Sequence, residues 1–366
     1  SITQAKLNFP VANRNLIING AMQVAQRGTS STTNGYGSVD RFPIYSQSTD
    51  EAPTHAQVDV ASGTTPYTSG FRKALKITNG NQTSGAGSGD LIAISYGIEA
   101  QDLANSGWNY TSASSYITLS FWVKSSVAQN FYVMLRSEDG TMRTYVIETG
   151  SLSADTWTKV TKTIPGNTSP TVDIDNNNGR GMLIEFVLFR GTDGTGSVTL
   201  NQWATYNSSA RVPNMTSTWY TTNDATFELT GVQLEVGSTA TDFEHRSFAQ
   251  ELQLCKRYFQ NHAPVSGDHM MWGVGRAESN TGRIGLPVSV PMRAAPTVYA
   301  AKNRLMKYDG NGSDSTSTPS VFAADSSWVP ESNIYTLDFG GHSLAHNNMY
   351  MLTCSADSKI TLSAEL

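Results

Sequence analysis

Apolar and polar residues alternate along several short segments of the chain, with the period of two that is typical of β-strands. In residues 116–124 the apolar positions that share one face are Ile117, Leu119, Phe121 and Val123. Residues 156–164 alternate in the same way, as expected of an outer strand. Residues 181–190 are almost entirely apolar, which predicts a central strand.

Residues 226–236 alternate along their whole length and predict a long strand. Phe227, Leu229 and Leu234 face inward in this pattern, together with either Gly231 or, after a bulge, Val232. Asn-Gly and Asp-Gly pairs, which tolerate positive φ, recur between the strand segments. Many short strands joined by such turns predict a β-sandwich.

One segment has the pattern of a helix instead. Ser247 and Gln250 have the spacing of a capping box, and the apolar residues that then share one helical face are Phe248, Leu252, Cys255 and Phe259. We therefore predict a mainly β chain with four parts. These are an N-terminal arm and candidate anchor over 1–14, a jelly-roll β-sandwich over 15–246, a linking helix over 247–262, and a smaller C-terminal β domain over 263–366.

The composition narrows the classes of function. The 366 residues are 38% hydrophobic and only 15% charged, with a net charge of −5. An acidic chain without a run of Lys or Arg lacks the basic patch that binding nucleic acid needs. No stretch approaches 18 consecutive apolar residues, so we expect no membrane insertion. We expect the two cysteines, Cys255 and Cys354, to be buried thiols and not a disulfide.

Motifs of catalysis are not found in the sequence. It has no Gly-x-Ser-x-Gly nucleophile elbow and no phosphate-binding loop. Its 30 acidic residues are spread along the chain, and no two of them stand out as the pair of carboxylates that glycoside hydrolysis needs. His342 and His346 have a spacing that metal ligands use on a helix, but the surrounding Gly and Asn residues favour a loop. We expect a protein that is not an enzyme and has no catalytic cofactor.

Aromatic residues within Gly-, Asn-, Ser- and Thr-rich segments are the candidates for binding sugars, because an exposed ring stacks on the CH face of a sugar. The candidate glycan-binding residues are Trp108, Tyr110, Trp203, Tyr206, Trp219 and Tyr220. The alternative interpretation is that these rings anchor loops in the core or are buried at subunit contacts, where Trp and Tyr are also common.

Three segments carry a resemblance to phage proteins. Residues 15–28 are similar to the "NL-x-x-NG-x-x-QV-x-QRG" start of many phage virion proteins. Residues 231–246 resemble the end of a carbohydrate-binding-module-like sandwich in that group, and residues 251–259 follow directly, as they do in tail-fibre-like and capsid-fibre-like proteins. Residues 290–298 and 364–366 are also similar to the C-terminal region of these proteins.

The resemblance implies a virion protein with a jelly-roll sandwich, assembled in the host cytoplasm as a homotrimer, with other virion proteins and host-surface glycans as partners. It leaves tail fibre, capsid fibre and decoration protein open. It also implies a structural calcium site, for which Asn19 and Glu235 are the weak candidates. The alternatives are a glycan-binding module outside a virion and a polysaccharide depolymerase.

Overall fold

A computed structural model describes residues 14–262, 271–278, 281–301, 304–307, 315–317, 321–324, 334–340, 349–353 and 359–366. The predicted arm, apart from Arg14, lies outside these residues, as do Cys354, His342 and His346. The chain divides into two compact units, one up to Glu251 together with Leu366 and the other Leu252–Glu365. Within the described residues, no helix is both long and apolar enough to cross a membrane.

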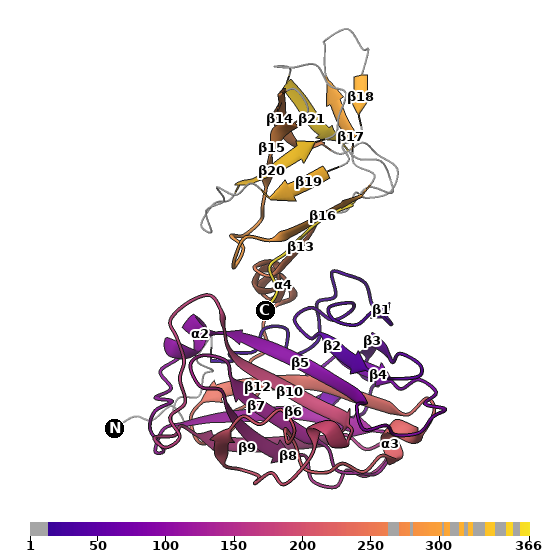
Figure 1. Cartoon of the computed structure of the whole chain (residues 1–366), viewed down its shortest axis with the longest axis vertical. Helices are drawn as coiled ribbons and strands as arrows, with labels where there is room; N and C mark the ends of the chain where they lie inside the picture. The colour runs from indigo at the N-terminus through magenta and orange to yellow at the C-terminus, as the bar shows by residue number, and fades with distance from the viewer. Residues whose placement is uncertain are drawn as a thin grey trace. The chain divides into compact units, whose positions relative to one another are not determined.

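The first unit holds two six-stranded antiparallel sheets (Figure 1). Sheet A has, in spatial order, the strands β1 (Ser30–Ser31), β3 (Thr54–Asp59), β4 (Lys73–Thr78), β12 (Thr226–Val236), β6 (Tyr116–Ser125) and β9 (Thr158–Pro165). Sheet B has the strands β11 (Trp203–Thr205), β8 (Arg143–Glu148), β7 (Tyr132–Ser137), β10 (Arg180–Arg190), β5 (Leu91–Glu99) and β2 (Ile44–Gln47). The short helices are α1 (Thr65–Thr68), α2 (Ala100–Ala104) and α3 (Thr218–Thr221), with a 3₁₀ turn at Thr192–Gly194.

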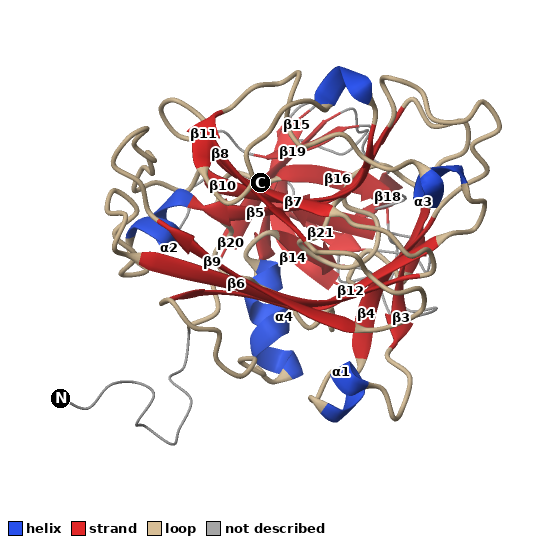
Figure 2. Cartoon of the chain, turned by 90° about the horizontal axis from the view of Figure 1, so that it is seen from below, coloured by secondary structure: helices blue, strands red, loops and turns tan. Residues whose placement is uncertain are grey.

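The two sheets pack face to face as a jelly-roll β-sandwich, and Figure 2 shows them as two layers. The predicted inward face of β6 is confirmed, because its four apolar residues are fully buried in the core between the sheets. Across that core the ring of Phe121 in sheet A meets the ring of Phe186 in sheet B edge to face, with 5.1 Å between the ring centres. The apolar strand β10 lies between β7 and β5, which confirms its predicted central position.

Strand β12 carries the predicted bulge. Its register with β6 shifts between Thr230 and Gln233, and Gly231 has a φ of +63°. Because the bulge adds a residue, Val232 takes the inward position in the core, whereas Gly231 faces the outer side of sheet A. The bulge alternative of the sequence pattern is therefore the correct one.

The outer faces of the sandwich are partly covered by loops. On sheet A, the hydroxyl of Thr118 donates to the carbonyl of Gly237 at 2.8 Å, in the segment that follows β12. On sheet B, an apolar cluster that includes Met134 and Val187 packs against Val212 of the long loop after β11. Outward-facing residues of both sheets are therefore buried in places, which alternation alone does not predict.

The helix after the sandwich is shorter than predicted. Its capping box is confirmed, because the backbone N–H of Ser247 donates to Gln250 Oε1 at 3.0 Å and that of Gln250 donates to Ser247 Oγ at 3.3 Å. However, α4 spans Phe248–Lys256, and Phe259–His262 form strand β13. The predicted helix over 247–262 is wrong after Lys256, because β13 pairs with β22 (Lys359–Ser363).

The second unit contains a three-stranded and a seven-stranded antiparallel sheet. The first has the order β13, β22 and β16 (Thr297–Ala301). The second has the order β18 (Ser315–Ser317), β17 (Arg304–Lys307), β21 (Met349–Thr353), β14 (Met271–Glu278), β15 (Thr281–Pro287), β20 (Ile334–Gly340) and β19 (Val321–Ala324). Cys255, in α4, is buried and is not part of a disulfide, as predicted.

Candidate functional site

Four of the six aromatic residues predicted to bind sugars are buried, so the expectation that they are exposed is wrong. Trp219 and Tyr220 are 0% and 1% exposed, and Trp108 and Trp203 are equally enclosed. Each has a polar tip with a protein partner, as buried Trp and Tyr require. The indole N–H groups of Trp203 and Trp219 donate to the carbonyls of Pro165 at 2.7 Å and Thr226 at 3.0 Å. These rings anchor loops in the core.

The other two candidates, Tyr110 and Tyr206, are half-buried. The hydroxyl of Tyr110 donates to the carbonyl of Ile174 at 3.0 Å. The ring of Tyr206 lies near two guanidinium groups, 4.7 Å from that of Arg136 and 5.6 Å from that of Arg211. Both side chains thus already have protein partners.

The six candidates are not brought together. Tyr110 lies near the start of β6, where its carbonyl accepts the backbone N–H of Asn167, just after β9. Trp219 lies near the end of β6, because its indole N–H donates to the carbonyl of Thr226, the first residue of β12. The structure therefore does not assemble a single sugar platform from these six residues.

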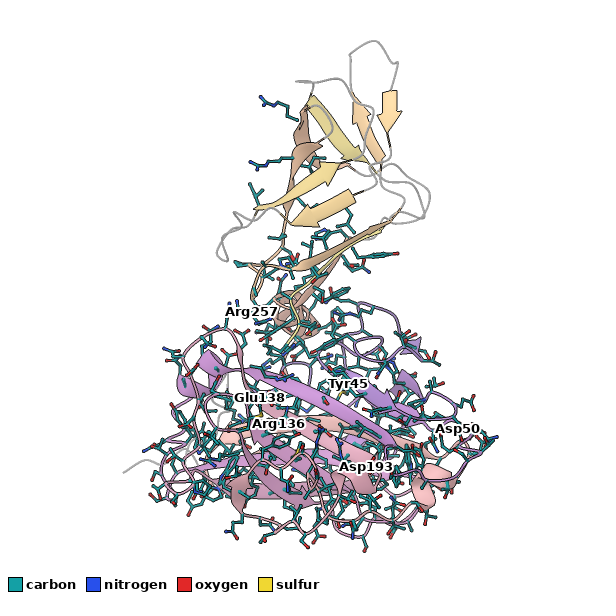
Figure 3. All side chains as sticks on the ribbon, in the orientation of Figure 1. Tyr45, Asp50, Arg136, Glu138, Asp193 and Arg257 are labelled. Atoms are coloured by element: carbon teal, nitrogen blue, oxygen red, sulfur yellow. The ribbon has the colours of Figure 1, made fainter. Side chains whose placement is uncertain are left out.

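Arg136, which stacks on Tyr206, belongs to a charged group on the outer face of sheet B. It binds Glu138 at 2.6 Å, and Figure 3 labels both residues. The same carboxylate binds Arg180 at 2.9 Å. Although burial opposes it, the interaction with Glu138 leaves the pKa of Arg136 above its usual value. Since Glu138 binds both guanidinium groups, we assign this group a structural role.

Asn19 and Glu235, the weak candidates for calcium, both have protein partners on their oxygens. The side-chain oxygen of Asn19 accepts the backbone N–H of Val24 at 2.9 Å. Glu235 accepts the backbone N–H of Thr241 at 2.8 Å and its hydroxyl at 2.6 Å. Among the residues that the structure describes, no group of three or more His, Cys, Asp or Glu side chains is arranged to hold a metal ion. The two residues fix the chain around them.

The residues that carry the phage resemblance meet in a buried polar junction, which consists of Asn15, Asn19, Glu244, Arg246 and Glu251. Glu244 accepts the backbone N–H of Asn15 at 2.8 Å, and Arg246 donates to the carbonyl of Asn15 at 2.6 Å. Glu251 accepts the backbone N–H of Asn19 at 2.5 Å. Burial raises the pKa of Glu251, although this N–H and Arg246 act in the opposite direction. The junction ties the N-terminal segment to the end of the sandwich and to α4.

A groove on the outer face of sheet A is the best candidate for a binding site. It has a volume of about 470 Å³, within the range of small-molecule sites. Its floor comes from Ser120 and Trp122 of β6, Lys159 of β9 and Gly231 at the bulge of β12. Trp122 and Lys159 are directly opposite each other in the β6–β9 pairing, so both project outward.

Two separate loops form the walls of this groove. The end of α1 and the turn after it contribute Thr68, Ser69, Gly70 and Phe71, and the segment after β12 contributes Thr241, Asp242, Phe243 and His245. The rings of Phe71, Phe243 and His245 form a triangle with centre-to-centre distances of 4.8 to 5.1 Å. His245 Nε2 also lies 3.0 Å from the carbonyl of Ser69, so the two walls are joined.

Two glycines allow this close packing. Gly70 has a φ of +98°, and a Cβ there would lie 2.8 Å from His245 Nε2. Gly231, with its φ of +63°, would place a Cβ 2.7 Å from the ring of Phe71. Both positions need a residue without a side chain, because of the backbone conformation and because of the space.

The groove presents polar groups that the protein itself does not use. In the described part of the chain, no hydrogen bond or ion pair involves the indole N–H of Trp122, the hydroxyl of Ser120, the ammonium of Lys159 or the carboxylate of Asp242. Lys124 is different, because it pairs with Glu228 at 2.9 Å and lies over Trp157. A half-buried aromatic ring is thus surrounded by uncommitted donors and one acceptor.

Sequence reasoning missed this groove, although one signal was present. If Phe121 and Val123 face the core, Trp122 between them must face outward. A large aromatic residue at an outward position of a strand is the feature that indicates the site.

Comparisons with known proteins give structural likenesses only. No family model matches the chain, and no curated protein matches it. A tailspike protein 4 enzymatically active domain of bacteriophage CBA120 is similar over 61% of this chain and 21% of its own length, with a TM-score of 0.31 and 10% identity. This chain therefore spans about a fifth of that tailspike chain.

Two sugar-binding proteins are similar at the same level. One is described as a putative sugar binding protein from Bacteroides thetaiotaomicron, with a TM-score of 0.30, 13% identity, and coverage of 61% of this chain and 100% of its own. The other is a family 11 carbohydrate-binding module from Clostridium thermocellum, with a TM-score of 0.26, 14% identity, and coverage of 59% and 98%. Likenesses this weak do not assign a function, which has to come from the site.

Proposed function

We propose that this chain is a structural component of a phage particle, a tail or capsid fibre or decoration protein, and that it contributes to host-surface attachment by binding a glycan in the groove on sheet A. The observation that carries the glycan part is the position of Trp122. Its half-buried ring lies on the floor of a cavity of about 470 Å³, beside Lys159 and Ser120, and Asp242 lines the wall of the same cavity.

The chemistry of the groove suits a sugar. An aromatic ring stacks on the CH face of a pyranose, while hydroxyl groups need donors and acceptors at its edge. The indole N–H, the ammonium of Lys159 and the hydroxyl of Ser120 are donors, and the carboxylate of Asp242 is an acceptor. Because the walls are joined by His245 and Ser69, the groove is preformed and little ordering is needed on binding.

The virion part of the proposal is supported by the resemblance in residues 15–28, 231–246 and 251–259. The first segment is far from the other two in the sequence, yet residues of all three form the polar junction around Asn15, Arg246 and Glu251. We propose homotrimers and contacts with other virion proteins on the same basis. Light scattering on the purified chain should give a mass of three copies, and a stable folded monomer would contradict the trimer.

We propose binding without catalysis. Glycoside hydrolysis uses two carboxyl groups on either side of the scissile bond. Asp242 is the single carboxylate among the described residues that line the groove. If the protein releases reducing ends from a host polysaccharide, this part of the proposal is wrong and the depolymerase alternative is correct.

A glycan array with the wild-type protein and the Trp122→Ala variant tests the glycan part. We expect one class of glycan to bind and its affinity to fall about tenfold or more in the variant, because the stacking surface is lost. Trp157→Ala is the matched control, because Trp157 packs against the same apolar cluster around Phe71 as Trp122 does but is not among the described residues that line the groove. A wild-type protein that binds no glycan would overturn this part of the proposal.

Immunogold labelling of purified particles tests the location. We expect antibodies against this chain to label an appendage or the capsid surface. If glycan binding is retained but particles are never labelled, the chain is a glycan-binding module outside a virion, and the virion part of the proposal falls.

A further inference from the structure

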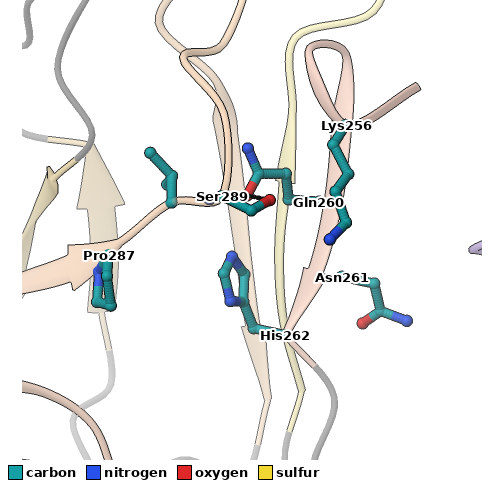
Figure 4. A pocket seen from close by; sticks show the side chains of 7 residues that line it. Lys256, Gln260, Asn261, His262, Pro287 and Ser289 are labelled. Atoms are coloured by element: carbon teal, nitrogen blue, oxygen red, sulfur yellow. Dashed lines mark hydrogen bonds between the residues drawn. The ribbon is translucent and has the colours of Figure 1, made fainter. Parts of the chain in front are cut away.

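The C-terminal unit contains a cavity of its own, unrelated to the groove on the sandwich. It has a volume of about 350 Å³ and lies between β13 with the end of α4 on one side and the segment after β15 on the other (Figure 4). The residues that line it are Lys256, Gln260, Asn261, His262, Pro287, Val288 and Ser289.

Gln260 holds the two sides of this cavity together. Its amide nitrogen donates to the carbonyl of Val290 at 2.9 Å. Its amide oxygen accepts the backbone N–H of Ser289 at 3.2 Å and lies 3.3 Å from the hydroxyl of the same residue. Because Gln260 is almost fully buried, these bonds are protected from water and fix the width of the cavity.

Two nitrogen groups that border the cavity have no protein partner among the described residues. His262 Nε2 is shielded from solvent and, within the described residues, makes no hydrogen bond. The ammonium of Lys256 makes no hydrogen bond or ion pair in the same part of the chain. A buried polar atom without a partner is costly and uncommon, so it needs an explanation.

The described residues around the cavity carry an unbalanced charge. Among the described residues that line it, Lys256 is the one charged residue, and neither β13 nor residues 287–289 contain a carboxylate. Burial and the positive charge of Lys256 lower the pKa of His262, so the imidazole is neutral near neutral pH. A neutral imidazole with its proton on Nε2 is a hydrogen-bond donor without an acceptor.

We propose that this cavity binds a small oxyanion, a carboxylate or phosphate group, between the Lys256 ammonium and His262 Nε2. The anion supplies the missing acceptor to His262 and offsets the charge of Lys256, and such charge-assisted bonds are the strong ones. The volume admits a single sugar acid or a phosphate, and not a polymer. The site is independent of the groove at Trp122, so either one can exist without the other.

The test is an NMR titration of the histidine side chains of the intact chain, with the His262 signal identified by its loss in His262→Gln. The probes are inorganic phosphate, glucuronate as a sugar carboxylate, and glucose as the uncharged match for glucuronate. We expect phosphate, glucuronate or both to raise the pKa of His262, because a bound anion favours the protonated ring. Glucose should have no effect. Equal ionic strength in sodium chloride controls for screening.

Lys256→Met tests the second contact. We expect it to weaken anion binding about tenfold or more, as the loss of a charge-assisted bond does. Lys162→Met, on strand β9 of the sandwich, removes the same charge elsewhere and should leave the affinity unchanged. If neither anion moves the pKa of His262, or if Lys256→Met and Lys162→Met bind the anion equally well, the proposal is wrong. A difference between phosphate and glucuronate identifies the source of the oxyanion.

Discussion

The ring of Phe71 lies directly against the backbone of Gly231, so that a Cβ on the glycine would be 2.7 Å from the Cζ atom of the ring. The glycine is the bulge residue of β12 and the ring belongs to the turn after α1, so this contact joins a wall of the groove to its floor. The turn after α1 can therefore pack this closely on sheet A only because residue 231 is a glycine.

We expect Gly231→Ala to destabilise the sandwich by about 2–4 kcal/mol, because it adds a left-handed backbone penalty to a steric clash. Urea unfolding measures the change. Gly63→Ala is the control, since Gly63 has a φ of +83° with nothing within 4 Å and reports the backbone penalty alone. Equal losses in the two variants would show that the contact with Phe71 has no energetic role.

The buried aromatic residues should affect stability and not binding. Trp219 is fully buried, and its ring meets that of Phe131 edge to face at 6.3 Å. We expect Trp219→Phe to cost about 1–3 kcal/mol in unfolding free energy, through lost volume and a lost indole hydrogen bond. Glycan affinity of the folded variant, measured by calorimetry, should be unchanged. If the variant loses glycan affinity without losing stability, Trp219 is a sugar contact after all.

The polar junction should make a large contribution to stability. Asn15 accepts the backbone N–H groups of Ile17 and Leu234, each at 3.0 Å, and donates to the carbonyl of Val232. Because these partners are buried, we expect Asn15→Ala to cost about 2–4 kcal/mol, measured by urea unfolding. Asn34 is exposed and bonds twice to the backbone of Ser46, so Asn34→Ala is the control and should cost less than about 1 kcal/mol. Similar costs would mean that burial does not strengthen the junction.

His55 should make stability depend on pH. The residue is buried, with Nδ1 2.7 Å from the hydroxyl of Ser38 and Nε2 2.9 Å from the carbonyl of Thr33. Burial lowers its pKa, although the Thr33 carbonyl acts in the opposite direction. As the pH falls, His55 is therefore protonated at a higher pH in the unfolded chain than in the folded chain. The stabilisation that neutral His55 provides is complete above the unfolded pKa of about 6.5 and is lost as the pH falls below it.

Comparison of His55→Gln with the wild type isolates this effect from the other histidines. We expect the gap between their unfolding free energies to narrow between pH 7.5 and pH 5.5, as measured by urea unfolding at each pH. A gap that stays constant would indicate that His55 has the same pKa in both states.

The strands were predictable because their signal is local. Alternation over residues 116–124 and 226–236 located β6 and β12, and the same pattern offered the bulge at Gly231 as an alternative. The end of α4 was not predictable in this way. Phe259 continues the helical spacing, but pairing with Ser363, more than a hundred residues later, places it in a strand.

The candidate site was harder to predict for the same reason. Whether an aromatic residue in a loop turns inward depends on distant partners, such as Thr226 for Trp219. The groove itself is built from separate segments around Phe71, Trp122, Lys159 and Phe243, and no local pattern connects them. Only the outward position of Trp122 was available from the sequence.

The position of β12 also bears on how the chain reaches its native state during synthesis. This strand lies between β4 and β6, yet it follows β6 by about a hundred residues. At typical translation rates it leaves the ribosome on the order of ten seconds after β6. Until then β4 and β6 each present an unpaired edge, which is a template for association with other chains. A crowded cell that makes many copies at once is thus where this topology is most exposed to misassembly, and where a chaperone that shields strand edges would have the greatest effect on yield.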